Sequence, residues 1–152
     1  MLCFKNGQRI AEVSLTDRAF HYGDGCFTTA RLRNGRIELH DLHLARLNNA
    51  NERLYLQADL KLIAQTLGEI RQFEAAASGT VKIILSRGDG QRGYSLPDHP
   101  ADVWVFYYPQ DVADFQYSIA DSGILEQAIG LTMPNLAGLK SLNRIEQVML
   151  KH

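Results

Sequence analysis

Lys140 lies in the segment Gly138–Asn143, after a glycine-containing loop and just before a predicted helix. A lysine in such a position is ordinarily an exposed amine, because most lysines are solvated. If the amine is desolvated, its pKa falls and it can form a Schiff base with a carbonyl group. The spacing alone leaves both interpretations open.

The loop Gly88–Gly93 matches GxGxxG and follows a predicted strand. A dinucleotide-binding turn would need a helix directly after it, so that the helix N-terminus meets the pyrophosphate. Here the chain continues into another strand, which argues against dinucleotide binding and favours a flexible connection. The same loop region carries Arg87, Arg92 and Tyr94, whose guanidinium and phenol groups could bind a carboxylate.

Two further segments combine polar and aromatic residues. Residues 17–29 (DRAFHYGDGCFTT) are either a structured loop with glycines at turn positions or the wall of a pocket. His43 and Arg46 are three residues apart and can share one helix face with His40 nearby. No third ligand suits a zinc site. This face is therefore either solvated or, through Arg46, able to bind a phosphate.

Composition narrows the function classes. The chain has 152 residues, 45% of them hydrophobic, and a formal net charge of −1, which gives no bias toward nucleic acid or anionic membranes. No apolar run reaches the roughly 18–20 residues that span a bilayer, and no secretory signal is visible. Two cysteines make no disulfide framework or metal site. We expect a cytoplasmic protein with reduced thiols and no metal.

The first 110 residues predict an α+β domain with an antiparallel sheet and two packed helices. Asn6-Gly7 and Asn34-Gly35 predict two hairpins, because both turn positions tolerate positive φ. Apolar spacing predicts two helices, one with Asp41 as N-cap and one over Asp59–Phe73. The strands expected here are Leu2–Lys5, Gln8–Val13, Cys26–Arg33, Arg36–His40, Thr80–Ser86 and Asp102–Tyr108.

Residues 111–152 predict a linker and the beginning of a second, larger α/β domain. Strands are expected over 115–120 and 128–133, a loop over 134–139 and a helix over 143–152. The chain stops inside that helix without a C-cap, so we expect a fragment of a longer protein.

Four ordered segments together resemble one enzyme superfamily. They are DRAFHYGDGCFTTAR, HLARL, SRGDGQRGY and AGLKSLNRIEQVML, and the resemblance covers essentially the whole chain. They are similar to the class IV aminotransferase-like enzymes that use pyridoxal 5'-phosphate (PLP). Within that superfamily, the GDGCFTTAR segment favours the branch of carbon–oxygen lyases that form 4-aminobenzoate and pyruvate from 4-amino-4-deoxychorismate, in folate biosynthesis.

The resemblance implies a role for particular residues. Lys140 would hold the cofactor covalently and act in catalysis, and Arg46 would contact its phosphate. Arg92 and Tyr94 would contact the substrate, as part of a homodimer. Asn143 and Arg144 would order the pocket. The acidic partner of the pyridine nitrogen lies beyond the lysine in this family, outside the 152 residues.

Two alternatives stay open. An aminotransferase acting on branched-chain or D-amino acids would share Lys140 and Arg46. An inactive fragment would serve at most as a dimerising domain. Partners other than a small-molecule substrate and a second copy, such as nucleic acid or membrane, are not expected.

Overall fold

The computed structural model describes residues 1–114, 117, 119 and 134–149. Its centre is a six-stranded antiparallel sheet with the order β2-β1-β6-β5-β3-β4. The strands are β1 (Leu2–Lys5), β2 (Gln8–Arg9), β3 (Gly25–Arg33), β4 (Arg36–Ile37), β5 (Gly79–Ser86) and β6 (Asp102–Pro109). The predicted α+β class is therefore confirmed.

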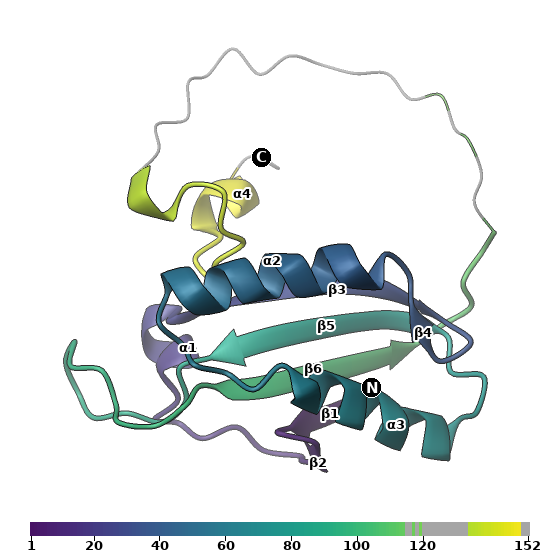
Figure 1. Ribbon diagram of the computed structural model, residues 1–152, viewed down its shortest axis with the longest axis horizontal. Helices are drawn as coiled ribbons and strands as arrows, with labels where there is room; N and C mark the ends of the chain where they lie inside the picture. The colour runs from purple at the N-terminus through teal and green to yellow at the C-terminus, as the bar shows by residue number, and fades with distance from the viewer. Residues whose placement is uncertain (115–116, 118, 120–133, 150–152) are drawn as a thin grey trace.

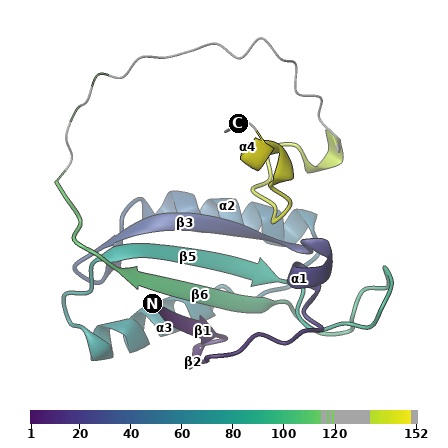
Figure 2. The ribbon, with the colours of Figure 1, turned by 180° about the vertical axis from the view of Figure 1, so that it is seen from behind.

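Two helices cover one face of this sheet, as Figure 1 shows, and Figure 2 shows the other face without a helix layer. They are α2 (His40–Arg53) and α3 (Lys61–Phe73). Three short helices complete the described elements, namely α1 (Arg18–Tyr22), the 3-10 helix η1 (Pro134–Leu136) and α4 (Ile145–Met149).

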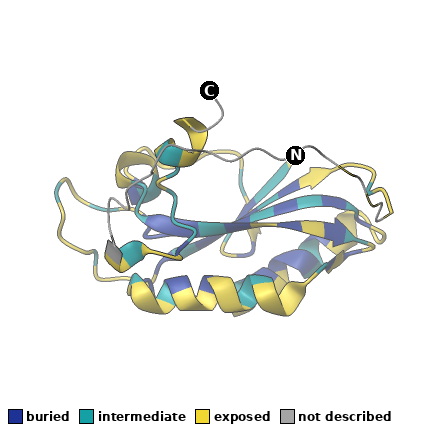
Figure 3. Ribbon diagram, turned by 90° about the horizontal axis from the view of Figure 1, so that it is seen from above, coloured by how far each residue is buried: buried dark blue, intermediate teal, exposed yellow. Residues whose placement is uncertain are grey.

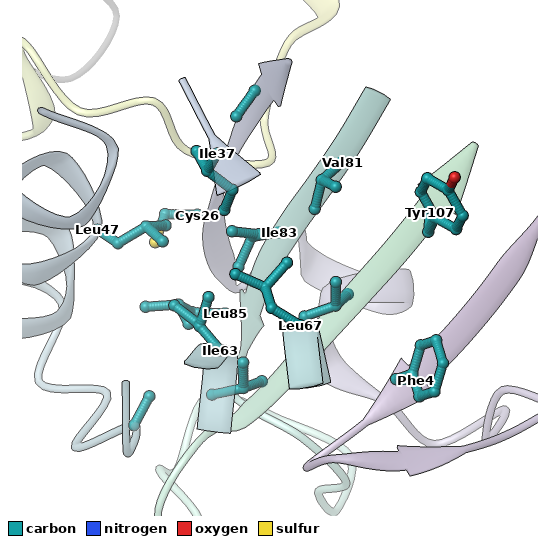
Figure 4. Close-up of a cluster of buried hydrophobic side chains, with 14 of the residues drawn as sticks. Phe4, Cys26, Ile37, Leu47, Ile63, Leu67, Val81, Ile83, Leu85 and Tyr107 are labelled. Carbon is teal, nitrogen blue, oxygen red and sulfur yellow. The ribbon is translucent and has the colours of Figure 1, made fainter. Parts of the chain in front are cut away.

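Strand alternation sends one set of side chains toward the helices. In β5, Val81, Ile83 and Leu85 are all fully buried, whereas Lys82 and Ile84 between them are partly exposed. Leu47 of α2 and Ile63 and Leu67 of α3 pack toward this row (Figure 4), and the outer sides of both helices are exposed (Figure 3). The core thus lies between the helices and the sheet.

Both predicted Asn-Gly hairpins are present. Asn6 and Asn34 have φ of 50° and 49°, and the glycines that follow have φ of 79° and 72°. The second strand of each hairpin is shorter than predicted. β2 ends at Arg9 rather than Val13, and β4 ends at Ile37 because α2 begins at His40.

The helix boundaries correct three predictions. Asp41 is not the N-cap of α2, because Leu39 takes a left-handed conformation (φ 53°) there and Asp41 falls in the first turn. α3 begins at Lys61 rather than Asp59, whose carboxylate accepts a hydrogen bond from the Lys61 amide (3.0 Å). α4 begins at Ile145 rather than at 143, and its predicted end at 152 lies outside the described residues.

The segment 17–29, expected to be a loop or a pocket wall, contains α1 and the start of β3. Asp17 caps α1 by accepting a hydrogen bond from the Ala19 amide (2.8 Å), and it also binds the Ser86 hydroxyl (2.5 Å). Gly23 ends the helix with φ 61°, in the left-handed region where glycine is unstrained.

The predicted strands at 115–120 and 128–133 lie outside the described residues, apart from the isolated positions 117 and 119. The division into a small domain and the beginning of a larger one stays a prediction. Among the described residues, no helix is long and apolar enough to cross a bilayer.

Substitution of two adjacent isoleucines on β5 tests whether the core lies on only one face of the sheet. Ile83→Ala should lower the free energy of unfolding by roughly 2–5 kcal/mol, because it leaves a cavity among fully buried side chains. Ile84→Ala, on the opposite face, should cost only about 1 kcal/mol, since Ile84 is partly exposed. Denaturant unfolding of both variants measures the difference, and equal losses would contradict this assignment of faces.

Candidate active site

Lys140 is held at the free edge of β3. β4 pairs with only the last two residues of β3, Leu32 and Arg33, which leaves the first half of that edge open. Residues 140–142 fill part of it. The Phe27 amide donates to the Lys140 carbonyl (3.0 Å), and the Leu142 amide donates to the Gly25 carbonyl (3.0 Å). The lysine backbone is thus fixed by strand-like hydrogen bonds to the sheet.

The approach to Lys140 is anchored as well. Leu139 is buried in the core cluster directly before the lysine. Arg53, at the end of α2, donates to the carbonyls of Asn135 (2.6 Å) and Ala137 (3.1 Å). In Figures 1 and 2 this segment lies over the end of the sheet that also carries α1. Both main-chain and side-chain contacts therefore determine where the amine lies.

The Phe27 ring forms the apolar floor of a cationic cluster. Lys140 Nζ lies 4.7 Å from the ring centroid, Lys82 Nζ 5.0 Å and the Arg144 guanidinium carbon 5.6 Å. Cations are attracted to the face of an aromatic ring. Three positive groups converging on one ring also repel one another, so this place is well suited to an anionic ligand.

The pKa of Lys140 is lowered from its ordinary value of 10.5. Partial burial is the largest cause, and the positive charges of Arg144, Arg46 and Lys82 add to it. Both effects disfavour the ammonium form. A larger fraction of this amine is neutral near pH 7 than of a solvated lysine, and the neutral amine is the nucleophilic form.

Arg46 belongs to a second group of contacts, centred on the fully buried Thr28. Arg46 Nη1 donates to Thr28 Oγ1 (3.3 Å), and Thr28 Oγ1 lies 2.7 Å from His43 Nδ1. Desolvation, followed by the charges of Arg46 and His40, lowers the pKa of His43. A neutral imidazole can accept a hydrogen bond from the Thr28 hydroxyl. The hydroxyl oxygen is then free to accept a hydrogen bond from Arg46. The guanidinium is oriented while most of it stays exposed and able to bind a phosphate.

A buried ion-pair network lies below the loop between β5 and β6. Asp24 accepts from Arg18 (2.9 Å) and lies 3.3 Å from Arg87 Nε. Arg87 also donates to the carbonyls of Leu54 (2.6 Å) and Tyr55 (2.7 Å) after α2. Arg87 is one of the three side chains near the glycine-rich loop that could bind a carboxylate by type, but it is buried and donates to groups within the protein.

The structure brings together part of the predicted site. Arg144 and Arg46 lie close enough to Lys140 for their positive charges to help lower its pKa. Arg144 also donates to the carbonyls of Ser141 (3.0 Å) and Leu139 (3.3 Å). It therefore holds the backbone on both sides of Lys140 in place, in addition to placing a positive charge near the lysine.

The other predicted residues lie at the end of α1 and on the β5–β6 loop. Asn143 donates to the Gly23 carbonyl at the end of α1 (3.2 Å). Arg92 and Tyr94 are exposed on the β5–β6 loop, where the Tyr94 ring lies 5.9 Å from the ring of Tyr22. Their roles toward substrate stay predictions.

Phe27, Thr28 and Lys82 were not singled out from the sequence. Strand alternation was the available signal, because it places Phe27 and Lys82 on the face away from the helices. The pairing of Thr29 with Lys82 is what brings the lysine beside Phe27, and register between distant strands is not readable from one sequence.

His99 is held between two backbone carbonyls at the β5–β6 loop. Its two ring nitrogens face the carbonyls of Pro100 and Asp89, both at 2.9 Å. Both nitrogens can donate only when the imidazole is protonated. The two carbonyls, with the charges of Asp102 and Asp89, raise the pKa of His99 above its ordinary 6.5.

Among the described residues, no group of three or more His, Cys, Asp or Glu side chains is placed to hold a metal ion. Cys3 and Cys26 are free thiols, and burial raises the pKa of Cys26 to about 12.

Comparison with known proteins gives the family. The sequence model of amino-transferase class IV matches residues 25–152. The chain belongs to this family. Enzymes of class IV use PLP and act on small molecules, and the cationic cluster, with a lysine whose pKa is lowered, suits such an anionic, amine-reactive cofactor.

Relatives with different activities match this chain. An aminodeoxychorismate lyase from Vibrio harveyi is 33% identical over 96% of this chain and 54% of its own length. A D-alanine aminotransferase from Staphylococcus aureus is 28% identical over 97% of the chain and 54% of its length. The crystal structure of 4-amino-4-deoxychorismate lyase from Pseudomonas aeruginosa matches with a TM-score of 0.76 and 30% identity, over 99% of this chain and 56% of that one. The chain thus spans about half the length of these relatives.

The His99 contacts predict a pH-dependent contribution to stability. Because the pKa is raised in the folded protein, this contribution is complete below the unfolded value near 6.5 and is lost as the pH rises through the folded pKa. The difference in unfolding free energy between the parent protein and His99→Gln should therefore shrink with increasing pH. An NMR titration should give His99 a pKa above 6.5, lowered again in Asp102→Asn. A pKa at or below 6.5 in the parent protein would contradict the prediction.

Proposed function

We propose that the protein carrying this chain is a PLP-dependent lyase that converts 4-amino-4-deoxychorismate to 4-aminobenzoate and pyruvate, with Lys140 as the residue that binds the cofactor covalently. The observation that carries the proposal is the amine of Lys140, held at the β3 edge beside Phe27 with its pKa lowered. The lyase relatives, at 33% and 30% identity, support this activity over the alternatives.

The residues present fit the cofactor. Arg46, oriented by Thr28, offers its remaining guanidinium donors to the phosphate group. Lys140 offers the amine, and Phe27 an apolar surface beside it. When bound, PLP supplies an electron sink for the carbanion of the substrate. These residues do not include an acidic partner for the pyridine nitrogen, whose place the family puts beyond the lysine.

Lys140 Nζ is also the proposed base. With cofactor and substrate bound, Lys140 Nζ would be placed to remove the proton from the carbon that bears the substrate nitrogen. Its lowered pKa favours the neutral form that this step requires. Breakage of the neighbouring carbon–oxygen bond would release enolpyruvate and form the aromatic ring, and the protonated Nζ could give its proton to the methylene carbon of enolpyruvate, which yields pyruvate.

The substrate carries two carboxylates, and the chain offers cations in two places. Lys82 and Arg144 lie with Lys140 around Phe27, and Arg92 lies with Tyr94 on the β5–β6 loop. We propose that carboxylate binding is divided between these groups, with Arg92 and Tyr94 acting in a homodimer. A cytoplasmic location agrees with this small-molecule chemistry.

A D-amino acid aminotransferase is the second candidate, because the Staphylococcus aureus relative is 28% identical over nearly the whole chain. It would use the same Lys140 and Arg46. The two activities differ in whether an acceptor keto acid is consumed.

The discriminating assay measures 4-aminobenzoate released from 4-amino-4-deoxychorismate by the full-length PLP-loaded protein. We expect release with no keto acid added, together with an equal amount of pyruvate. Strict dependence of turnover on an added keto acid, with a D-amino acid as donor, would replace the lyase by the aminotransferase.

The Lys140→Ala variant should lose the visible absorbance of lysine-bound PLP, and its lyase rate should fall by roughly 10²–10⁴-fold, because the proposed base is removed. Lys61→Ala, an exposed lysine of α3, is the matched control and should keep both properties. Persistence of the absorbance band in Lys140→Ala would refute the assignment.

A further inference from the structure

Helix α1 contacts both parts of the proposed site. At its C-terminal end, the Gly23 carbonyl accepts the Asn143 side-chain amide, three residues after Lys140 (3.2 Å). On the other side, α1 holds the peptide between Arg92 and Tyr94, through Gly93. Figures 1 and 2 show α1 at the end of the sheet where the lysine segment and the β5–β6 loop both approach.

Both backbone polar groups of Gly93 bind residues of α1. Arg18 Nη1 donates to the Gly93 carbonyl (2.9 Å), and the Gly93 amide donates to the Tyr22 hydroxyl (3.1 Å). Gly93 has φ 110°, which an L side chain rarely adopts, so the loop needs glycine here. A residue held through both its amide and its carbonyl fixes the two peptide groups that join it to its neighbours, and thus the direction of the residues on either side.

Arg18 is itself rigidly held, although it contacts an exposed loop. The residue is only 4% exposed, its Nε is paired with Asp24, and its guanidinium lies 4.7 Å from the centre of the Tyr22 ring. Asp24 is shared with Arg87, which binds the backbone after α2. The chain of contacts therefore runs from the core to Gly93.

The backbone of the β5–β6 loop also packs closely against Arg18. A Cβ atom at Gly90 would lie 2.6 Å from Arg18 Cδ, so the loop backbone packs directly on the arginine stem. In addition, the Arg18 amide donates to the Gly88 carbonyl (2.9 Å). Arg18 thus contacts the loop at Gly88, Gly90 and Gly93.

We propose that Arg18, assisted by Tyr22, is a positioning residue that sets the conformation of the Arg92–Tyr94 segment and through it the affinity for substrate carboxylates. The inference rests on the proposed function for the role of Arg92 and Tyr94. Arginine suits this task because its planar fork donates to the Asp24 carboxylate and to the Gly93 carbonyl at once. A lysine at position 18 has one nitrogen and cannot reproduce both directions.

The first test is limited trypsin cleavage after Arg92 in the full-length PLP-loaded protein, followed by mass spectrometry. Arg18→Lys and Tyr22→Phe should each speed this cleavage about tenfold, because a loop released from α1 opens more often. Arg36→Lys, an exposed arginine on β4, is the control and should leave the rate unchanged.

The second test is steady-state kinetics. Both variants should raise KM by about tenfold while kcat and the absorbance of bound PLP stay close to the parent values. A loop that only binds substrate stabilises the bound substrate and the transition state equally, so its loss weakens binding without slowing the chemical step. A general loss of structure would instead lower kcat and PLP content together. Unchanged cleavage and unchanged KM in folded variants would overturn the proposal, as would a fall in kcat alone.

Tyr22→Phe keeps the inference testable if Arg18→Lys does not fold, since it removes one hydroxyl and leaves the buried ion pair intact. The cleavage measurement needs no turnover. A parent protein without lyase activity would therefore count against the proposed function, whereas the trypsin result would still decide whether Arg18 and Tyr22 fix the loop.

Discussion

The pairing of residues 140–142 with the open edge of β3 is the interaction on which the proposed site depends. Two backbone hydrogen bonds, Phe27 to Lys140 and Leu142 to Gly25, join parts of the chain more than 100 residues apart. An unpaired strand edge leaves backbone donors and acceptors unsatisfied, so this edge favours any segment that can complete it. Completing it with the lysine segment places the amine over the Phe27 ring.

Electrostatics explains why that placement matters. Lys140, Lys82, Arg144 and Arg46 bring positive charge to one end of the sheet, and their mutual repulsion is part of what lowers the pKa of Lys140. A phosphate or a carboxylate bound there would relieve the repulsion. The same feature therefore weakens the ammonium form in the free protein and favours anionic ligands, which agrees with a family of PLP enzymes.

Local signals predicted much of the fold. The two Asn-Gly turns and the apolar spacing of α3 required only neighbouring residues, and each is present. α1 was missed because five residues show no helical period. Asp41 is the expected N-cap of α2 because aspartate is a favoured residue type there, and nothing in the sequence indicates that Leu39 takes a left-handed conformation.

The site was harder to predict than the fold. Lys140 and Arg46 came from the resemblance of whole segments, since neither residue is distinctive by spacing. Phe27 and Lys82 depend on strand register, and the link from Arg18 to Gly93 joins residues 75 positions apart. Such contacts follow from topology, which a single sequence does not display.

The central claim, that Lys140 is the lysine that binds PLP, is tested most directly by borohydride reduction of the full-length PLP-loaded protein and peptide mapping of the pyridoxyl group. Lys82 is the internal competitor, because its amine lies 5.0 Å from the same Phe27 ring. We expect the label on Lys140. A label on Lys82, or on any other lysine, would contradict it.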